Sequence, residues 1–134
     1  MIEWTTNELI KNGYEIENGR ITDVDLSMAD HGVITLTLCV SGNGCGFVYG
    51  GYALGHGYLG AEHFDSTEHA LVYIMKIMDT VGVENFNGLK GKYIRFATKG
   101  WGDCITIIGN IISDKWFDTK SFFEDSPDDL EKGE

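Results

Sequence analysis

Basic residues, proline and cysteine are all scarce in this sequence. Among its 134 residues are ten lysines and arginines against 21 aspartates and glutamates, a single proline and three cysteines. The net charge of −11 excludes counterion release as a driving force for binding nucleic acid, and anionic membrane surfaces would repel the chain. We therefore expect basic or neutral partners, and we expect neither nucleic acid nor a membrane as a direct partner.

Long apolar runs are absent as well. No run approaches the roughly 20 residues that a membrane-spanning helix needs, and residues 1–13 lack the basic start and the apolar segment of a signal peptide. The three cysteines, Cys39, Cys45 and Cys104, cannot all pair within one chain, and unpaired thiols are typical of a reducing compartment. The sequence thus predicts a cytoplasmic protein.

The length predicts one domain, and the composition of its end predicts a tail. A chain of this size can bury one hydrophobic core, and no repeat or linker interrupts residues 1–123. Residues 124–134 hold six acids and one lysine, a composition typical of a flexible, solvated terminus. Residues 1–123 still carry a charge of −6, so the excess of acid also belongs to the domain.

Local signals predict a short helix and an antiparallel sheet in the first half. Thr5 and Glu8 form a capping box, and Asn12-Gly13 would end the helix soon after it. Asn18-Gly19 predicts a two-residue hairpin turn, because both central positions of such a turn require positive φ. Alternation of apolar and polar residues, with a turn at residues 29–32, predicts a meander of strands near residues 20–28, 33–40 and 47–52.

The second half changes to a helical period. Asp65 and Glu68 supply a start signal for a helix, and Gly82 supplies a left-handed stop. Apolar residues recur between them at helical spacing and predict a buried stripe of Ala70, Leu71, Ile74, Ile77, Met78 and Val81. A hairpin and a closing aromatic segment follow in residues 92–123. The sequence therefore predicts an α+β fold in which an antiparallel sheet, made of the meander and the C-terminal hairpin, packs against one main amphipathic helix.

Seven glycines lie between Ser41 and Gly57. A phosphate-binding loop would run into a helix and carry a basic residue, but this stretch runs into a strand, and residues 41–69 contain no lysine or arginine. The glycines are therefore interpreted as a structural corner. A recognition surface is compatible with that interpretation, because aromatic side chains among glycines can anchor an interface, and the candidates are Phe47, Tyr49, Tyr52 and Tyr58.

Two further features are candidates for partner binding. Trp101 stands between two glycines at the tip of the predicted C-terminal hairpin, where it either folds back onto the sheet or projects as an anchor. Asp23 and Asp25 alternate with Val24 and Leu26, which predicts a wet acidic face and a buried apolar face. The acidic face is a candidate surface for a basic partner.

Metal binding is an alternative that the histidines suggest. His56, His63 and His69 fall near Asp65 and Glu68, and imidazole with carboxylate suits zinc, yet their spacing matches no known ligand motif. No catalytic arrangement is recognisable, since no thiol or hydroxyl has the signature of an activating base or an oxyanion hole beside it. We therefore expect a protein that is not an enzyme, with either no cofactor or zinc.

Between about Gly13 and Asp118 the chain contains the stretches ENGRITDV, DHGVITLTL, GGYALG, YIMKIMDTVGVENF, LKGKYIRF and IGNIISDKWFD. Through these stretches the sequence resembles small proteins of phages and prophages of Firmicutes. The resemblance brings no catalytic motif, so it assigns no active-site residue. Small acidic phage proteins of this kind are often inhibitors of host defence, with anti-CRISPR proteins as a leading example, and the resemblance implies that setting.

Three hypotheses about function follow. The first, favoured by charge, is a non-enzymatic inhibitor in the host cytoplasm that occupies the basic nucleic-acid-binding surface of a CRISPR effector nuclease. The alternatives are a binder of a small ligand such as a signalling nucleotide, with a pocket between Gly42 and Tyr58, and a zinc-binding protein. The sequence predicts neither the target nor the oligomeric state. The acids that we expect to matter for the first hypothesis are Asp23, Asp25, Glu68, Asp79, Glu84, Glu124 and Asp125.

Overall fold

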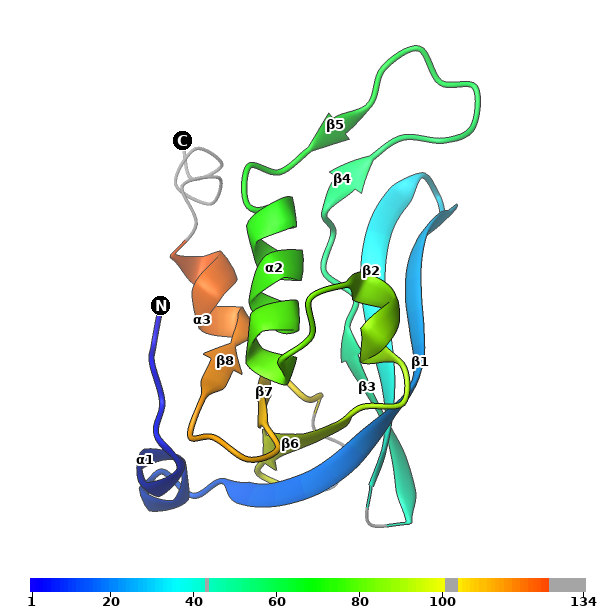
Figure 1. Cartoon of the computed structure of the whole chain (residues 1–134). Coiled ribbons are helices and arrows are strands. Elements are labelled where there is room, and N and C mark those ends of the chain that lie inside the picture. Colours follow the sequence, from blue (N-terminus) through cyan, green and yellow to red (C-terminus); the bar gives the residue numbers. More distant parts are fainter. Residues whose placement is uncertain (43, 101–103, 126–134) are drawn as a thin grey trace.

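The structure is a computed structural model that describes residues 1–42, 44–100 and 104–125 (Figure 1). Within these residues the fold is α+β, as the sequence predicts, with an eight-stranded antiparallel sheet and helices packed on it. No helix in the described part of the chain is long and apolar enough to cross a membrane. The elements are α1 (Thr6–Lys11), β1 (Glu15–Asp30), β2 (Val33–Gly42), β3 (Cys45–Gly50), β4 (Gly55–His56), β5 (Asp65–Ser66), α2 (Ala70–Val81), η1 (Phe86–Leu89, a 3₁₀ helix), β6 (Tyr93–Thr98), β7 (Ile107–Asn110), β8 (Trp116–Asp118) and α3 (Thr119–Glu124).

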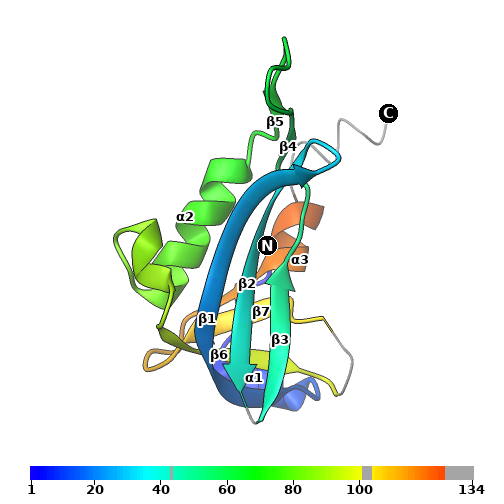
Figure 2. The same ribbon diagram turned by 90° about the vertical axis from the view of Figure 1, so that its right-hand side faces the viewer.

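The long strand β1 joins the two parts of the sheet. The strand order is β5-β4-β2-β1-β6-β7-β8, and β3 pairs with β2 outside this path. Residues 15–20 of β1 pair with β6, whereas residues 20–30 pair with β2. Figure 2 shows β1 as a long curved ribbon. The meander and the C-terminal hairpin therefore belong to one continuous sheet.

The predicted turn at Asn18-Gly19 is wrong, because both residues lie inside β1. They pair there with residues of β6. A Cβ atom on Gly19 would lie 2.6 Å from Val40 Cγ1 and 2.9 Å from Phe96 Cε1. Glycine is needed at this position for close packing between strands rather than for a turn.

The two-residue turn of the first hairpin lies at His31 and Gly32, within the predicted turn region. Their φ angles are 55° and 75°, both positive, as this kind of turn requires. Farther along, Gly50 has a φ of 106°, and a Cβ atom there would collide with the carbonyl oxygen of Leu36. The predicted structural use of glycine is therefore confirmed at Gly50.

Helix α2 confirms the predicted helix over residues 70–81 and its stop at Gly82, whose φ is 94°. The predicted start signal is wrong, because Asp65 lies in β5 and the N-cap is His69, whose side chain makes no capping hydrogen bond. The buried stripe also differs, since Leu71 is 72% exposed whereas Tyr73 is buried. The helix turns Tyr73 toward the sheet, because an aromatic ring buries a large apolar area.

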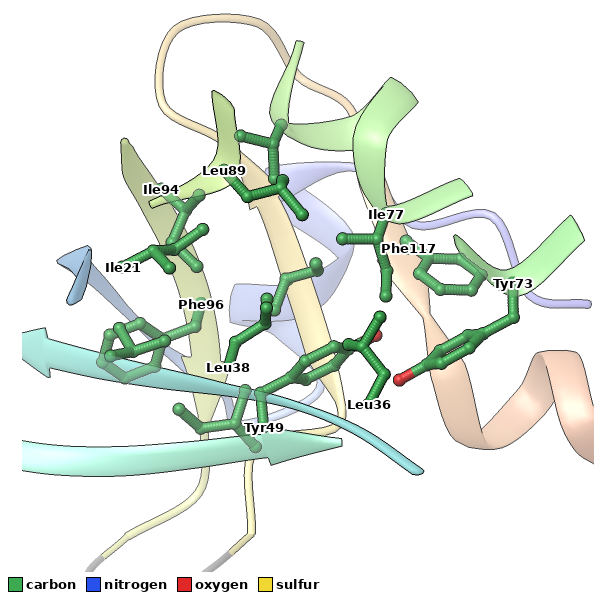
Figure 3. Close-up of a cluster of buried hydrophobic side chains, with 14 of the residues drawn as sticks. Ile21, Leu36, Leu38, Tyr49, Tyr73, Ile77, Leu89, Ile94, Phe96 and Phe117 are labelled. Atoms are coloured by element: carbon green, nitrogen blue, oxygen red, sulfur yellow. The ribbon is translucent and has the colours of Figure 1, made fainter. Parts of the chain in front are cut away.

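The main core lies between α2 and the curved sheet (Figure 3). A smaller cluster joins α1 to the C-terminal hairpin through Leu9, Ala97, Ile107 and Trp116. Both clusters join segments that are far apart in the sequence, so the two halves of the chain share their packing. The labelled residues of the main core are Ile21, Leu36, Leu38, Tyr49, Tyr73, Ile77, Leu89, Ile94, Phe96 and Phe117.

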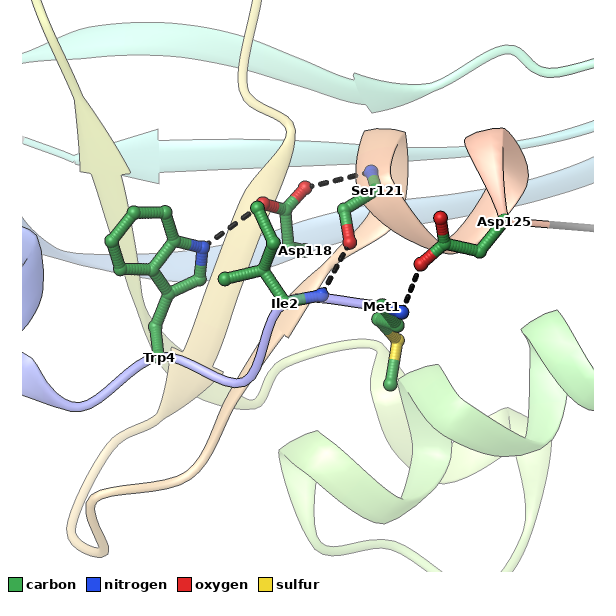
Figure 4. Close-up of polar contacts among 6 residues, drawn as sticks. All are labelled: Met1, Ile2, Trp4, Asp118, Ser121 and Asp125. Carbon is green, nitrogen blue, oxygen red and sulfur yellow. Dashed lines mark hydrogen bonds and ion pairs between the residues drawn. The ribbon is translucent and has the colours of Figure 1, made fainter.

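The N-terminal segment is held against β8 and α3 (Figure 4). Trp4 Nε1 donates a hydrogen bond to Asp118 Oδ2 at 2.9 Å, and the backbone N–H of Ile2 donates to Ser121 Oγ at 2.5 Å. The amino group of Met1 contacts a carboxylate near the end of α3. The first residues of the chain therefore lie beside its last described helix.

The predicted acidic tail begins inside the described fold. Glu124 is the last residue of α3, and Asp125 is its C-cap and contacts the Met1 amino group. Regular structure therefore continues past the predicted boundary at residue 123. Residues 126–134 lie outside the described residues, so the flexibility of that part stays a prediction.

Candidate protein-binding surface

Charge is unevenly distributed along the fold. Residues 21–75 contain six acids, all four histidines and no lysine or arginine, and we call them the cation-free segment. They form the second part of β1, the strands β2 to β5 and the first half of α2. All ten lysines and arginines belong to residues 1–20 and 76–134. The carboxylates of the cation-free segment therefore have no lysine or arginine within their own stretch of chain to neutralise them.

The β4–β5 hairpin (residues 55–66) projects from this segment (Figures 1 and 2). Its two short strands pair with each other, and β4 also pairs with the start of β2. Backbone hydrogen bonds hold the loop beyond the strands. Gly57 N–H donates to the carbonyl oxygen of Gly32 at 2.7 Å, and Ala61 N–H donates to that of Tyr58 at 2.9 Å. The loop is therefore tied to the β1–β2 turn and closed by a turn of its own.

Three large apolar side chains on this loop are exposed, and we call them the hairpin tip. Tyr58 is 64%, Leu59 87% and Phe64 61% exposed. The ring of Phe64 lies over the backbone of Gly57, where a Cβ atom would collide with it. Apolar side chains that gather on a projecting loop are typical of residues that bury themselves in a partner. The sequence predicts Tyr58 as such a residue but not Leu59 or Phe64.

Tyr49, a predicted contact residue, lies in the core and is not available to a partner. Its side chain is fully buried, and its hydroxyl contacts Thr119 Oγ1. Burial raises the pKa of Tyr49 well above its ordinary value, with a further contribution from neighbouring Tyr73. The prediction fails because Gly46 and Val48 lie on the outer face of β3, whereas Tyr49 lies on the inner face.

Two other predicted aromatics also pack inward. The ring centroid of Phe47 lies 5.0 Å from that of Phe96, and Phe47 packs against the main core. Tyr52 stacks on Phe123 with a centroid distance of 4.7 Å. Both side chains are half-buried, so they offer a partner only part of their surface. Trp101 lies outside the described residues, and its role as an anchor stays a prediction.

Asp23 and Asp25 lie on the outer face of β1, as the alternation predicts. Both are exposed, and they pair across the sheet with Cys39 and Thr37 of β2. Figure 2 shows this face of β1, β2 and β3 toward the viewer, with the helices beside or behind it. Asp23 Oδ1 is 3.9 Å from the Nζ atom of Lys90, and both side chains are exposed, so this pair is weak.

The other candidate acids divide into two groups. Asp79 pairs with Lys115, with Oδ1 2.8 Å from Nζ, and Asp125 contacts the Met1 amino group, so local cations already neutralise these two carboxylates. The exposed acids Glu68, Glu84 and Glu124 lie before α2, after α2 and at the end of α3. The acids nearest the hairpin tip in the fold are those of the cation-free segment.

The histidines do not form a cluster. His56 lies in β4, His63 in the loop of the β4–β5 hairpin, and His69 at the N-cap of α2, where its ring meets Phe122 edge-on at 5.9 Å. Among the residues that the structure describes, no group of three His, Cys, Asp or Glu side chains could hold a metal ion. The zinc hypothesis therefore gains no ligand set from this part of the chain.

A cleft of about 400 Å³ lies away from the cation-free segment, between the N-terminal segment, α2 and the start of β8. Trp4, Asp79 and Trp116 contribute to its lining. On its wall, Asp114 accepts hydrogen bonds from Thr6, which lower the pKa of its carboxyl group. The cleft does not include residues 42–58, where the sequence predicts a ligand pocket.

Comparisons of the chain with protein-family models, with curated proteins and with solved structures found no match. Within the described residues, the fold combines a segment without lysine or arginine, an outer sheet face and a projecting apolar tip. Exposed apolar side chains of this kind mark a candidate protein-binding surface.

Proposed function

We propose that the chain is a non-enzymatic inhibitor that binds a basic, nucleic-acid-binding protein of the bacterial cytoplasm, such as a CRISPR effector nuclease, and covers its nucleic-acid surface. The observation that carries the proposal is the hairpin tip, which projects from a segment with six acids and no lysine or arginine. The resemblance to phage proteins supports the bacterial setting.

Electrostatic attraction would bring the two proteins together. A basic surface that approaches the cation-free segment meets the carboxylates of Asp23, Asp25, Glu62 and Asp65 and no lysine or arginine of that segment. Complementary charge raises association rates and discriminates among partners more than it adds affinity. Salt screens exposed charges beyond a Debye length of about 8 Å under physiological conditions, so the attraction would weaken as salt rises.

The hairpin tip would supply most of the affinity. Fully burying one large apolar side chain is worth roughly 1.5–3 kcal/mol, and a few such anchors dominate most protein interfaces. Because backbone hydrogen bonds from Gly57 and Ala61 already hold the loop, binding would order little additional chain. A preformed apolar projection fits a pocket in the partner, with the acids at the rim of the contact.

Co-purification tests this proposal. The tagged chain is expressed in a bacterium that carries CRISPR and other defence nucleases, and we expect it to recover one basic protein in stoichiometric amount. The recovered protein should bind less nucleic acid with the chain than alone. The double variant Leu59→Ser/Phe64→Ser should bind that protein about thirtyfold more weakly, the equivalent of about 2 kcal/mol.

Ile112→Ser is the matched control, because Ile112 is an exposed apolar residue that lies outside the cation-free segment. This variant should bind as the wild type does. The proposal fails if no basic protein is recovered, or if the recovered protein binds nucleic acid equally well in the complex. It also fails if the control variant loses as much affinity as the hairpin-tip variant.

A further inference from the structure

Strand β1 has an open edge over most of its second part. Up to Arg20 it pairs with β6, and the backbone of Ile21 forms hydrogen bonds on the same side, donating to the Lys92 carbonyl at 2.8 Å and accepting from Gly91 N–H at 2.7 Å. Beyond this point, residues 22–30 pair with β2 on one side, and no described strand lies on the other. Backbone N–H and C=O groups along such an edge can pair with a strand of another chain.

This edge lacks most of the features that usually prevent pairing. Residues 22–30 contain no lysine and no proline, and Asp23 and Asp25 are exposed on the outer face. Register shifts occur at Ile21/Asp23 and at Ser27/Asp30, so the stretch between them, residues 23–27, keeps regular pairing with β2. A partner strand would therefore meet a regular, accessible backbone over these residues.

The inner face of the edge is left partly uncovered. Leu26 is 45% exposed although it pairs with the fully buried Leu36 of β2. The sequence predicts Leu26 as buried, and it is partly exposed because no described strand lies beside β1 at this position. A strand added to this edge would place an apolar side chain next to Leu26 and would complete the inner face.

A depression beside the start of this edge has room for a side chain of such a strand. This depression of about 280 Å³ is lined by Asp23 and Val24 of β1 and by Phe86, Asn87 and Lys90 of η1 and the residue after it. Figure 2 shows α2 and η1 alongside the same edge of β1. The depression can take an inward-facing apolar side chain of the added strand, with the ring of Phe86 in its wall.

The charges at the edge determine what kind of strand it would accept. Asp23 and Asp25 occupy alternate positions on the outer face, so basic side chains at alternate positions of an added strand would lie opposite them. A second copy of this chain, paired through the same edge about a two-fold axis, would instead bring these carboxylates together. Like charges opposite one another destabilise a strand pair, so a second copy is disfavoured.

We propose that the open edge of β1, residues 22–28, binds an extended segment of a basic partner as an added β-strand. Lysine or arginine side chains of that segment face Asp23 and Asp25, and the apolar side chains between them cover Leu26. This inference rests on the proposed function in that it names the segment of the basic partner that is recognised. The main-chain hydrogen bonds supply affinity, and the alternate side chains supply selectivity.

A peptide of alternating lysine and valine tests the inference on the full chain by NMR. At saturation we expect amide hydrogen exchange of the outward-directed N–H groups of residues 22–28 to slow about tenfold or more. A peptide with the same sequence but N-methylated at every valine cannot pair through those nitrogens and should not bind. A peptide of alternating glutamate and valine should not bind either, because its charges oppose those of Asp23 and Asp25.

Two variants separate edge pairing from general charge attraction. Leu26→Lys places a charge on the inner face of the edge and should weaken binding of the lysine–valine peptide about tenfold or more. Val48→Lys is the matched control, since Val48 is an exposed apolar residue on the outer face of β3, and this variant should bind nearly as the wild type does. Circular dichroism should show the same native spectrum for both.

The outcomes distinguish this inference from the proposed function. If the N-methylated peptide binds equally well, or if protection appears elsewhere than in residues 22–28, strand addition is overturned even where a basic partner is recovered from cells. If the edge is protected as expected but no basic protein is recovered, the proposed function fails and the edge remains a binding site. Equal binding by Leu26→Lys and the wild type also overturns strand addition.

Discussion

Asp118 joins the N-terminal segment to the start of α3. It is buried, and one carboxylate oxygen accepts from Trp4 Nε1 at 2.9 Å while the other accepts from Ser121 N–H at 3.0 Å. Asp118 is the N-cap residue of α3, and the hydrogen bond from Ser121 N–H is the capping bond. One carboxylate therefore accepts hydrogen bonds from a partly buried indole and from the start of a helix, two groups that are far apart in the sequence.

Asp118→Ala should lower the free energy of unfolding by about 2–3 kcal/mol. The loss combines a helix cap, worth about 1 kcal/mol, with a partly buried indole N–H that keeps no partner. Urea unfolding measured by tryptophan fluorescence would show it. Asp25→Ala, which removes an exposed carboxylate, is the control and should change stability by less than about 0.5 kcal/mol. Equal effects of the two substitutions would contradict this account of Asp118.

Single residues also show where sequence reasoning fails. Asn18-Gly19 is a strong turn signal in isolation, yet the glycine is used because Val40 and Phe96 come too close for a side chain. No local pattern reports a neighbour that lies more than 20 residues away. Tyr58 is predicted to be exposed and is exposed, whereas Tyr49 is buried because the inward face of a short strand depends on what packs above it.

At the scale of elements, Asn110 couples β7 to the end of α2. Its Nδ2 atom donates to the carbonyl oxygens of Thr80 at 3.0 Å and Val81 at 3.3 Å, which are among the last carbonyls of the helix. Its Oδ1 atom accepts from the backbone N–H groups of Ile112 and Ser113, both at 2.9 Å. One amide thus caps a helix and shapes the turn after a strand.

Asn110→Ala should destabilise the fold by about 2–3 kcal/mol, because it leaves helix carbonyls and turn N–H groups without their partners. The melting temperature should fall in parallel, by several degrees for a chain of this size. Asn87→Ala, at an exposed position of η1, is the control and should melt close to the wild type. A drop of less than about 0.5 kcal/mol for Asn110→Ala would show that water replaces its bonds.

Elements with strong local signals are the ones that the sequence predicts well. The capping box of α1 forms between Thr5 and Glu8, and the stop of α2 forms at Gly82. The β4–β5 hairpin is not predicted, because its strands are too short to show alternation and depend on pairing with β2. No local sequence pattern predicts the open edge of β1, because this edge depends on where the pairing with β6 ends.

Over the whole molecule, the cation-free segment holds six acids and no lysine or arginine, whereas the rest of the chain holds every lysine and arginine. We therefore expect the position of the carboxylates, rather than the net charge, to control the rate of association with a basic partner. A variant with Asp23, Asp25, Glu62 and Asp65 changed to their amides should associate with a basic partner about tenfold more slowly at low salt and depend less on salt. Amides at Glu3, Glu8, Glu15 and Glu17 make the same change in net charge outside the cation-free segment and should have a smaller effect. Stopped-flow kinetics at several salt concentrations would measure both.

Equal slowing by the two sets of substitutions would show that total charge, and not its arrangement in the fold, governs the approach. Neither set should alter the cooperativity of unfolding, since all eight carboxylates belong to residues with solvent-accessible side chains. The comparison therefore separates the electrostatic contribution from any change in the fold.

The attachment of the first residues to α3 bears on the order in which the chain can fold. Residues 15–20 can pair only after β6 has been synthesised, and Trp4 can bond only after Asp118 has been synthesised. Few long-range native contacts of residues 1–20 can therefore form while synthesis is still under way. Pairings that span most of the chain are slow to form, because a long loop must close before they contribute any energy. The nascent chain would therefore reach its native state only when nearly all of its described residues have left the ribosome.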